Sequence, residues 1–550
     1  MAVKRPNILI ILTDEERFPP VYESAALAEW SRTQLPAHAF LRQHGLEFCR
    51  HYIAASACCP SRASLFTGQY PSLHGVSQTP GAAKTAFDPD QFWLDPNTVP
   101  TLGDYMRLNG YRTYYLGKWH FSNADIIRPG SHLSFPSYNP ATGIPDPASE
   151  QLYLHANRLD EYGFSHWVGP EPHGKNPHNS GSSSAIGPRG RDQTYASLFT
   201  SLIDQLEQER MSGDAARTDA PWLIVTSFVN PHDIVLYGDY STMSPLFSFP
   251  VAPSIPDVPY PPTYEETLAD RPSCQRSYRR LYHRAFQPIS DERYYFRLYY
   301  QLIKNADDQM MRVLDRFRRS SFYDETLIVF TADHGDLLGA HGRLHQKFYC
   351  AYEEALHVPL IIHQPKLFPV PRQSELLTSH IDLVPTILGL TGADVTKLQA
   401  TLRFTHTETR LFVGRNLADA FLGKQTVDRS WEPIYFMTSD DPTSGLHQVS
   451  LLGVPYPSVK GPKQIETVIA QLRTSVGEEL WKYSRYFEPD VPDCEEFELY
   501  NLSADPEERI NLAHPDWMDS SSWQIQQIMK TLLQEQAREK RLTPLTAGVQ

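Results

Sequence analysis

The chain has 550 residues, enough for one large domain and a smaller one, and its net charge is -14. Hydrophobic residues make up 41% and charged residues 21%, which is typical of globular proteins and excludes a disordered or fibrous chain. No long run of Lys or Arg is present, so nucleic acid is not an expected partner. No run of about 18 apolar residues occurs, so we expect neither a membrane span nor a membrane partner.

The N-terminal segment only briefly resembles a signal peptide. Lys4 and Arg5 precede the apolar run Ile8–Leu12, but that run is too short for a signal peptide and the acids Asp14–Glu16 follow it directly. We interpret it as a buried strand and expect a cytoplasmic protein. The six cysteines are too few and too scattered for a disulfide framework, and no Cys-x-x-Cys pair indicates structural zinc.

Short apolar runs alternate with helical patterns through the first four hundred residues. Strands are predicted, in chain order, at Ile8–Leu12, Tyr111–Leu116, Trp222–Val229, Thr326–Phe330 and Val358–His363. Helices are predicted at Thr101–Asn109, ended by Gly110, and at Tyr294–Arg318. This alternation predicts an α/β domain with a large, mostly parallel central sheet flanked by helices.

Two segments interrupt the alternation, and the pattern changes again near residue 425. Ser134–Gly190 and Pro245–Pro272 are rich in residues that disfavour helix and strand interiors, and they fit either binding loops or surface insertions without function. Beyond residue 425, strands are predicted at Pro433–Met437 and Lys482–Phe487, and a terminal helix at Trp523–Glu539. We therefore expect a catalytic domain over 1–425 and a smaller α+β domain with an antiparallel sheet over 426–550.

Acidic residues and a histidine follow two of the predicted strands. Asp14 and Glu15 come after the first strand, and Asp333 and His334 come after the strand at 326–330. In open α/β sheets, ligands bind at the carboxyl ends of strands. Three carboxylates and an imidazole would suit one divalent cation, although either pair alone is also common in ordinary turns.

The run Cys58-Cys59-Pro60-Ser61-Arg62, followed by Thr67-Gly68, carries the most specific signal. It resembles the Cys-x-Pro-Ser-Arg signature of formylglycine-dependent sulfatases, in which a formylglycine-generating enzyme oxidises the first cysteine to 3-oxoalanine. Gln69 stands where Arg is frequent in that family. The alternative is an unmodified buried cysteine at the start of a helix.

The resemblance extends over most of the chain, with the two Pro-rich segments as gaps. The matching segments are Pro6–Asp14, Leu35–Phe48, Tyr70–Gly75, Gly117–His120, Asn230–His232, Asp333–Asp336, Leu344–Leu360, Glu498–Leu502 and Asp505–Glu507. It implies the fold of the alkaline phosphatase superfamily. Within that superfamily the chain resembles arylsulfatases, choline sulfatases and phosphonate monoester hydrolases. It also implies that one divalent cation is held by Asp14, Glu15, Asp333 and His334, with modified Cys58 as a further ligand.

The resemblance also implies roles for the remaining polar residues. Arg62 would steady residue 58, Lys118 and Lys347 would neutralise sulfate oxygens, His120 would take a proton from the hydrated aldehyde, and His232 would act as general acid. Each of these residue types is also common in structural positions.

Some positions leave alternatives open. His341 and His345 are alternatives to Lys347, and His74 is expected to be structural. Glu15 stands where many members carry Asp, and His334 where many carry Asn. These departures leave the metal open between calcium and manganese. The resemblance implies Ca²⁺ as the expected metal, with Mn²⁺ or Mg²⁺ as alternatives.

These features predict a sulfatase that hydrolyses sulfate monoesters through a metal-bound formylglycine hydrate and a covalent sulfo-enzyme intermediate. The expected substrate is a small-molecule or carbohydrate sulfate ester. One alternative is a phosphonate monoester or phosphodiester hydrolase with the same nucleophile. A catalytically silent binding protein of the same fold is a second alternative, and a two-zinc alkaline phosphatase fits least because no second set of Asp and His ligands is evident.

Overall fold

The structure is a computed structural model that describes residues 5–172, 176–212, 220–424, 432–491 and 494–545. Its large sheet is formed by β1 (Asn7–Asp14), β2 (Gly45–Phe48), β4 (Arg112–Gly117), β5 (Trp222–Pro231), β6 (Thr326–Ala332), β7 (Leu360–His363) and β8 (Arg372–Ser374). The strand order is β4-β5-β1-β6-β7-β2-β8. Only the pairs made by β7 are antiparallel, which confirms the predicted, mostly parallel sheet.

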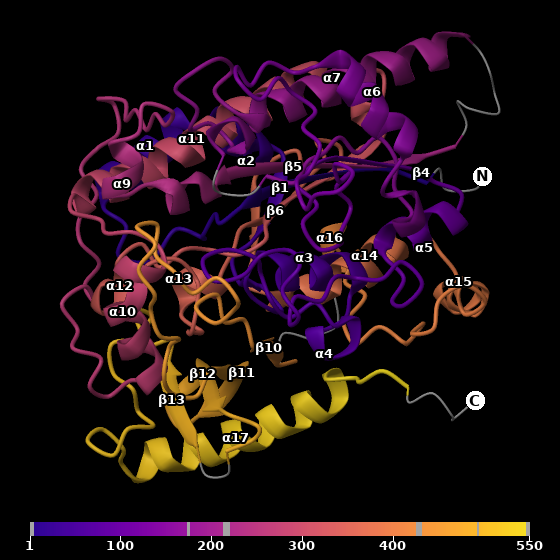
Figure 1. The fold of residues 1–550 in the computed structure, drawn as a ribbon. Helices are drawn as coiled ribbons and strands as arrows, with labels where there is room; N and C mark the ends of the chain where they lie inside the picture. The colour runs from indigo at the N-terminus through magenta and orange to yellow at the C-terminus, as the bar shows by residue number, and fades with distance from the viewer. Residues whose placement is uncertain (1–4, 173–175, 213–219, 425–431, 492–493, 546–550) are drawn as a thin grey trace.

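Helices cover both faces of this sheet (Figure 1). One face carries α1 (Ala25–Gln34), α2 (Pro36–Gln43), α7 (Arg191–Ser212) and α11 (Glu292–Phe317). The other carries α3 (Cys58–Thr67), α4 (Pro71–His74), α5 (Leu102–Leu108), α14 (Leu383–Leu390), α15 (Val395–Leu402) and α16 (Ala418–Phe421). Alternate residues of β1 supply both cores: Ile10 belongs to the cluster of Phe66 in α3, whereas Ile11 belongs to that of Met310 in α11.

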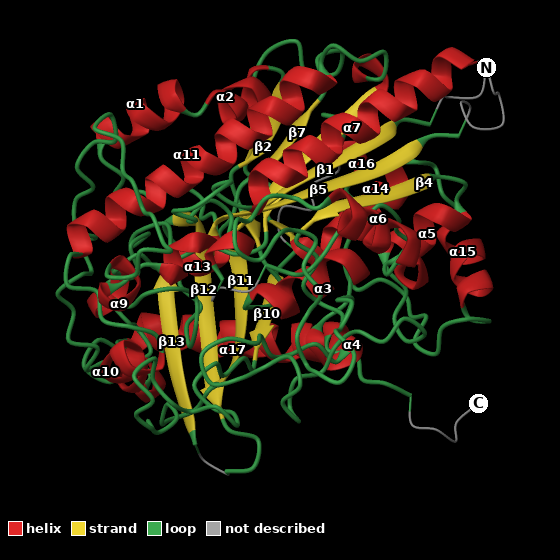
Figure 2. Cartoon of the chain, turned by 45° about the horizontal axis from the view of Figure 1, so that its top comes forward, coloured by secondary structure: helices red, strands yellow, loops and turns green. Residues whose placement is uncertain are grey.

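A second, antiparallel sheet lies below the first (Figure 2). Its strands are β10 (Ile434–Thr438), β11 (Gln464–Thr474), β12 (Gly477–Phe487) and β13 (Glu495–Asn501), in that order. Helix α17 (Ser520–Lys540) runs along its outer face and begins at Asp519, whose side chain accepts from the Ser522 N–H. The predicted C-terminal antiparallel sheet and helix are confirmed, while the predicted boundary at 425/426 lies outside the described residues.

Shorter elements connect these layers. They are β3 (His51–Tyr52), β9 (Thr378–Ser379), α6 (Pro147–Ala156), α9 (Asp239–Thr242), α10 (Ser273–Ala285), α12 (Ala340–Arg343), α13 (Glu353–Leu356), and the 3-10 helices η1 (Asp160–Tyr162), η2 (Pro177–Asn179), η3 (His232–Leu236), η4 (Tyr323–Glu325) and η5 (His380–Asp382). Helix α6 lies inside Ser134–Gly190, where no helix was expected. It forms there because Asp146 caps its N-terminus and Pro147 occupies its first position. The segment 245–272 contains no helix.

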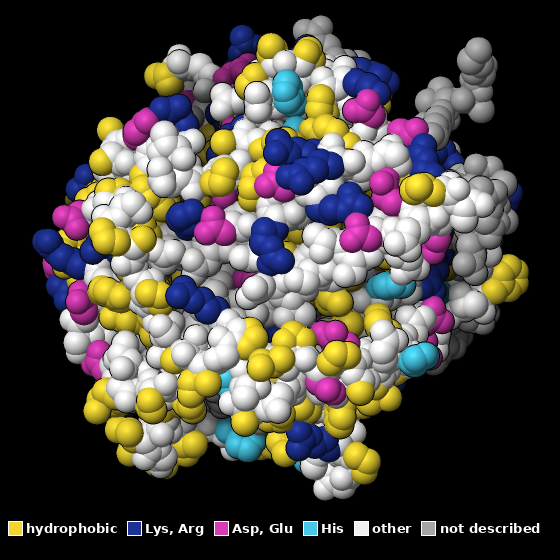
Figure 3. Space-filling view, turned by 90° about the horizontal axis from the view of Figure 1, so that it is seen from above, with side chains coloured by type: hydrophobic (Ala, Val, Ile, Leu, Met, Phe, Trp, Pro, Cys, Tyr) yellow, Lys and Arg dark blue, Asp and Glu magenta, His cyan; other side chains and the backbone are white. Residues whose placement is uncertain are grey.

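The helical face seen from above carries acidic and basic side chains intermixed (Figure 3). Pairs such as Arg316–Asp204 and Lys304–Asp308 lie on this face, on α7 and α11. No helix within the described part of the chain is both long and apolar enough to cross a membrane.

Candidate active site

Four neighbouring strands, β4, β5, β1 and β6, end at the same edge of the large sheet because they run parallel. The polar residues at these ends are, in strand order, Lys118 and His120, then His232, then Asp14 and Glu15, then Asp333 and His334. Residues that are hundreds of positions apart thereby meet at one place, where α/β sheets bind ligands.

Cys58 reaches this edge as the first residue of α3, which is preceded by Ala57 and ends at Gly68 in the left-handed conformation. The Cys58 Sγ atom lies 3.0 Å from His334 Nε2 and 3.8 Å from Asp14 Oδ1. Burial and the Asp14 carboxylate raise the pKa of the Cys58 thiol to about 12, so the thiol is protonated at neutral pH.

A group that could hold a metal ion surrounds this sulfur. Ligand atoms of Asp14, Cys58, Asp333 and His334 all lie within 4.8 Å of one another, and all four residues are buried. His334 Nδ1 lies 2.9 Å from the Gly335 carbonyl oxygen, so it donates there and leaves Nε2 facing the two carboxylates. Carboxylate oxygens with one imidazole fit a divalent cation.

Glu15 lies beside this group rather than in it. Its carboxylate forms an ion pair with Lys347, with 2.9 Å between Oε1 and Nζ. Together with Asp14 and His232 it forms a second possible ligand group that shares Asp14 with the first. Its backbone has a φ of 71°, and its N–H donates to Asp333 Oδ1 at 3.0 Å. The structure thus brings four of the five predicted ligands together and places the fifth next to them.

Two buried cations bracket the carboxylates. Arg62 follows Cys58 by one helical turn of α3, so the same helix places both residues at the site. Arg62 Nε lies 2.7 Å from Asp333 Oδ2, and its Nη2 lies 3.1 Å from Asp14 Oδ2. Lys118 also forms an ion pair with Asp14. Burial alone would raise the pKa of Asp14, but Lys118, His232 and Arg62 hold it well below its usual value.

Lys347 is the candidate that contacts a predicted site residue, through its ion pair with Glu15. His341 is instead 3.2 Å from Glu354 and stacks on Tyr352. His345 packs edge-on against Tyr295. Among the three residues that the sequence left open, geometry therefore favours Lys347.

His232 begins η3 directly after β5, and a ring nitrogen lies within 4.8 Å of Asp14 and Glu15 ligand atoms. Burial and the nearby Lys118 hold its pKa well below the usual value. The turn is fixed by the next residue, Asp233, whose carboxylate accepts from the N–H groups of residues 181 and 182 at 2.8 and 2.7 Å.

Glu171 is a residue of this region that sequence reasoning missed. Its Oε1 accepts from the His120 N–H at 2.8 Å and from the Trp119 N–H at 3.2 Å, which fixes a turn in which His120 has a φ of 66°. Burial, followed by the nearby Asp125 carboxylate, raises the pKa of Glu171 to about 8. No motif marks this residue, because it lies in the Pro-rich segment 134–190.

A seven-stranded, mostly parallel sheet whose carboxyl edge carries this set of ionisable groups defines an α/β fold with a polar site at its strand ends. The family model for sulfatases matches residues 6–393, so the chain belongs to the sulfatase family. The chain is accordingly a sulfuric ester hydrolase, as predicted.

Two relatives and one solved structure illustrate this membership. The chain is 28% identical over 407 residues to the uncharacterised sulfatase YidJ of Escherichia coli K12, covering 72% of this chain and 69% of that protein. It is 25% identical over 414 residues to the choline-sulfatase of Rhizobium meliloti, covering 72% and 70%. The fold resembles the phosphonate monoester hydrolase of Agrobacterium radiobacter with a TM-score of 0.59 and 20% identity, over 98% and 96% of the two chains.

Proposed function

We propose that this sulfatase hydrolyses sulfate monoesters with a formylglycine made from Cys58 and one divalent cation, Ca²⁺ being expected. The observation that carries the proposal is the position of Cys58 Sγ, 3.0 Å from His334 Nε2 inside a group that also holds Asp14 and Asp333. The cation would be held by Asp14, Asp333 and His334, together with residue 58 and Glu15. A dication bound there lowers the pKa of an oxygen nucleophile and withdraws charge from the ester.

The chemistry at residue 58 follows from an aldehyde that adds water to become a geminal diol. One hydroxyl group gives its proton to water as its oxygen attacks sulfur, the bond from sulfur to the alcohol oxygen breaks, and His232 donates a proton to that alcohol oxygen. The anionic ester beside His232 favours its protonated form. The sulfated residue then passes the proton of its second hydroxyl to His120, the carbonyl re-forms, and sulfate leaves with the bonding electrons.

The buried cations would stabilise charge on the sulfate. Lys118 and Lys347 already lie against the Asp14 and Glu15 carboxylates at the site, and Arg62 contacts Asp14 and Asp333. Positive groups fixed in a buried site stabilise an anionic transition state without reorganisation. A binding protein without activity would have no use for this arrangement, in which every candidate ligand and base is retained.

The first experiment is mass spectrometry of the tryptic peptide His51–Arg62 from protein produced with a formylglycine-generating enzyme. We expect residue 58 as the aldehyde and Cys59 as a thiol. A fully active protein with both residues as thiols would contradict the proposal.

The second experiment separates sulfate esters from phosphorus esters. We expect kcat/KM to be higher for a sulfate monoester than for the phosphonate monoester and the phosphodiester with the same leaving group. A preference for either phosphorus ester by more than about 1.4 kcal/mol, a tenfold ratio, would move the assignment to a phosphonate monoester or phosphodiester hydrolase.

A further inference from the structure

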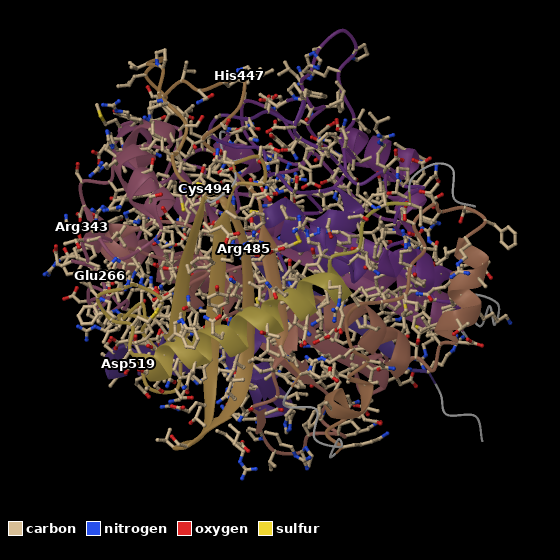
Figure 4. All side chains as sticks on the ribbon, turned by 90° about the horizontal axis from the view of Figure 1, so that it is seen from below. Glu266, Arg343, His447, Arg485, Cys494 and Asp519 are labelled. Carbon is tan, nitrogen blue, oxygen red and sulfur yellow. The ribbon has the colours of Figure 1, made fainter. Side chains whose placement is uncertain are left out.

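A cavity of about 500 Å³ lies beside the turn that carries His120. Glu171 is in its wall, and the same carboxyl group accepts from the His120 N–H. Trp93 is also in its wall, and its ring centroid is 6.4 Å from that of His120. The lining also includes His447, which lies near the top of the view in Figure 4.

The aromatic side chains of Phe87, Trp93 and His132 line this cavity. The rings of Phe87 and His132 lie with their centroids 4.6 Å apart. Trp93 Nε1 donates to the Ala86 carbonyl oxygen at 2.9 Å, which fixes the indole. Fixed aromatic rings offer apolar surface against which a ring of similar size can pack.

Three of the polar groups of the wall are carboxyls. Asp88, Asp125 and Glu171 line the cavity, and no Lys or Arg is among the described residues that do so. Asp88 accepts from the N–H groups of Thr85 and Leu446, and Asp125 accepts from the Glu171 N–H. Glu171 Oε2 is buried and has no hydrogen-bond partner within the described residues, so it has capacity for a ligand hydroxyl.

We propose that this cavity receives the alcohol part of the ester and selects an uncharged ring that bears hydroxyl groups, such as a neutral sugar. The inference rests on the proposed function, because the alcohol must extend from a sulfate held at residue 58. A ring carrying a carboxylate or a second sulfate would meet the carboxylates of Asp88 and Asp125 and, among the described residues of the wall, neither Lys nor Arg, at a cost in desolvation and repulsion. A hydroxyl group of the ring would pair with Glu171 Oε2.

The direct test compares monosulfated glucose with glucuronic acid sulfated at the same position, for each positional isomer. We expect kcat/KM for the best glucose sulfate to exceed that of the matching uronate by about tenfold or more. A uronate that is hydrolysed as well or better would overturn the inference. 4-Nitrophenyl sulfate serves as the reference for the chemistry, so its failure would count against the proposed function instead.

Two substitutions locate the effect in the cavity. Trp93→Ala should raise KM for the glucose sulfate about tenfold with little change in kcat, while inhibition by inorganic sulfate stays the same. Trp523→Ala, at a half-exposed position on α17, is the matched control. Phe87→Arg should lower the ratio of kcat/KM for the glucose sulfate to kcat/KM for the uronate, and Phe87→Leu should leave this ratio unchanged. Unchanged KM in Trp93→Ala would contradict the assignment.

A binding measurement reads the cavity without turnover. Calorimetric titration of the Cys58→Ala protein with the same glucose and glucuronic acid sulfates should give tighter binding of the glucose compound. Trp93→Ala in that background should remove the difference. Equal affinities, or tighter binding of the uronate, would overturn the inference even if the protein hydrolyses no sulfate ester.

Discussion

At the scale of single residues, Cys58 and the neighbouring Cys59 differ in what their side chains contact. Cys59 is the adjacent cysteine, but it is buried in the core cluster that includes Phe66, whereas Cys58 faces His334 and Asp14. Both thiols are fully buried, so burial does not distinguish them. The two cysteines are distinguished by the directions of their side chains. These directions differ because the residues are successive positions at the start of α3.

We predict that Cys58→Ala abolishes turnover while the fold survives, and that Cys59→Ala retains substantial activity. The first variant removes the atom that becomes the nucleophile, whereas the second removes one sulfur from an apolar core, at a cost of about 1 kcal/mol in stability. Steady-state kinetics with circular dichroism checks both. Activity in Cys58→Ala with loss in Cys59→Ala would show that the signature is misassigned by one residue.

Asp14 and Asp333 give a second prediction at the same scale. Asp14→Asn and Asp333→Asn should each lower metal content and activity, because each removes one anionic ligand and one partner of Arg62. Elemental analysis of the purified variants measures occupancy, with exposed Asp95→Asn as the control. Removal of the metal from the protein without substitutions by a chelator should suppress activity, and added Ca²⁺ or Mn²⁺ should restore it. Full activity in metal-free protein would refute the site.

The site was largely predictable at the residue scale because its members are short motifs placed directly after strands. The sequence places Asp14, Lys118 and Asp333 at strand ends, and parallel strands must bring those ends together. Glu171 was not predictable, since its role depends on backbone N–H groups of residues 119 and 120 that approach it only in the folded chain.

At the scale of elements, composition misled where it was averaged over a long segment. The high content of Pro, Gly and Ser in 134–190 hid α6, although Asp146 and Pro147 are good helix-starting residues. Strands β11 and β13 were also missed. β13 contains Glu495, Glu496 and Glu498, and Glu498 is buried because it accepts hydrogen bonds from the hydroxyls of Tyr352, Tyr486 and Tyr500, partners that a sequence pattern cannot reveal.

The junction of α2 and α11 allows a prediction about pH. Asp307 of α11 accepts from the N–H groups of Ala37 and His38 at the start of α2. The His38 ring lies 2.7 Å from Glu16 and 2.6 Å from Asp307. Burial acts to lower the pKa of His38, but Glu16 and Asp307 raise it to about 9, so the folded protein favours the protonated ring.

Because the folded pKa of His38 is raised, its contribution is fully present below the unfolded pKa of about 6.5 and is lost as the pH rises through about 9. The difference in unfolding free energy between the unmodified protein and His38→Gln should therefore shrink by about 3 kcal/mol between about pH 6 and about pH 10. Urea titrations at the two pH values measure it, with the exposed His155→Gln as control. A difference that does not change with pH would contradict the assignment.

At the scale of the whole molecule, the small sheet is joined to the large one through buried charges. Lys482 of β12 lies 2.7 Å from Glu508 and 2.9 Å from Glu353 of α13, and it is almost completely buried. Glu353 also accepts from the Tyr52 hydroxyl in β3 at 3.0 Å. The chain segment that leads to α13 carries Lys347, so the small sheet supports the part of the large domain that contributes this cation to the site.

We predict that Lys482→Met destabilises the protein by about 3 kcal/mol, because it leaves the buried Glu508 and the partly buried Glu353 without their shared cation. The matched control is Lys424→Met, whose ion pair with Asp419 is exposed and should contribute no more than about 1 kcal/mol. Denaturant unfolding measures both variants. If the small sheet supports the segment of Lys347, Lys482→Met should also raise KM for a sulfate ester below its unfolding midpoint, whereas Lys424→Met should not. Equal effects of the two substitutions on stability would show that the buried pair does not join the sheets.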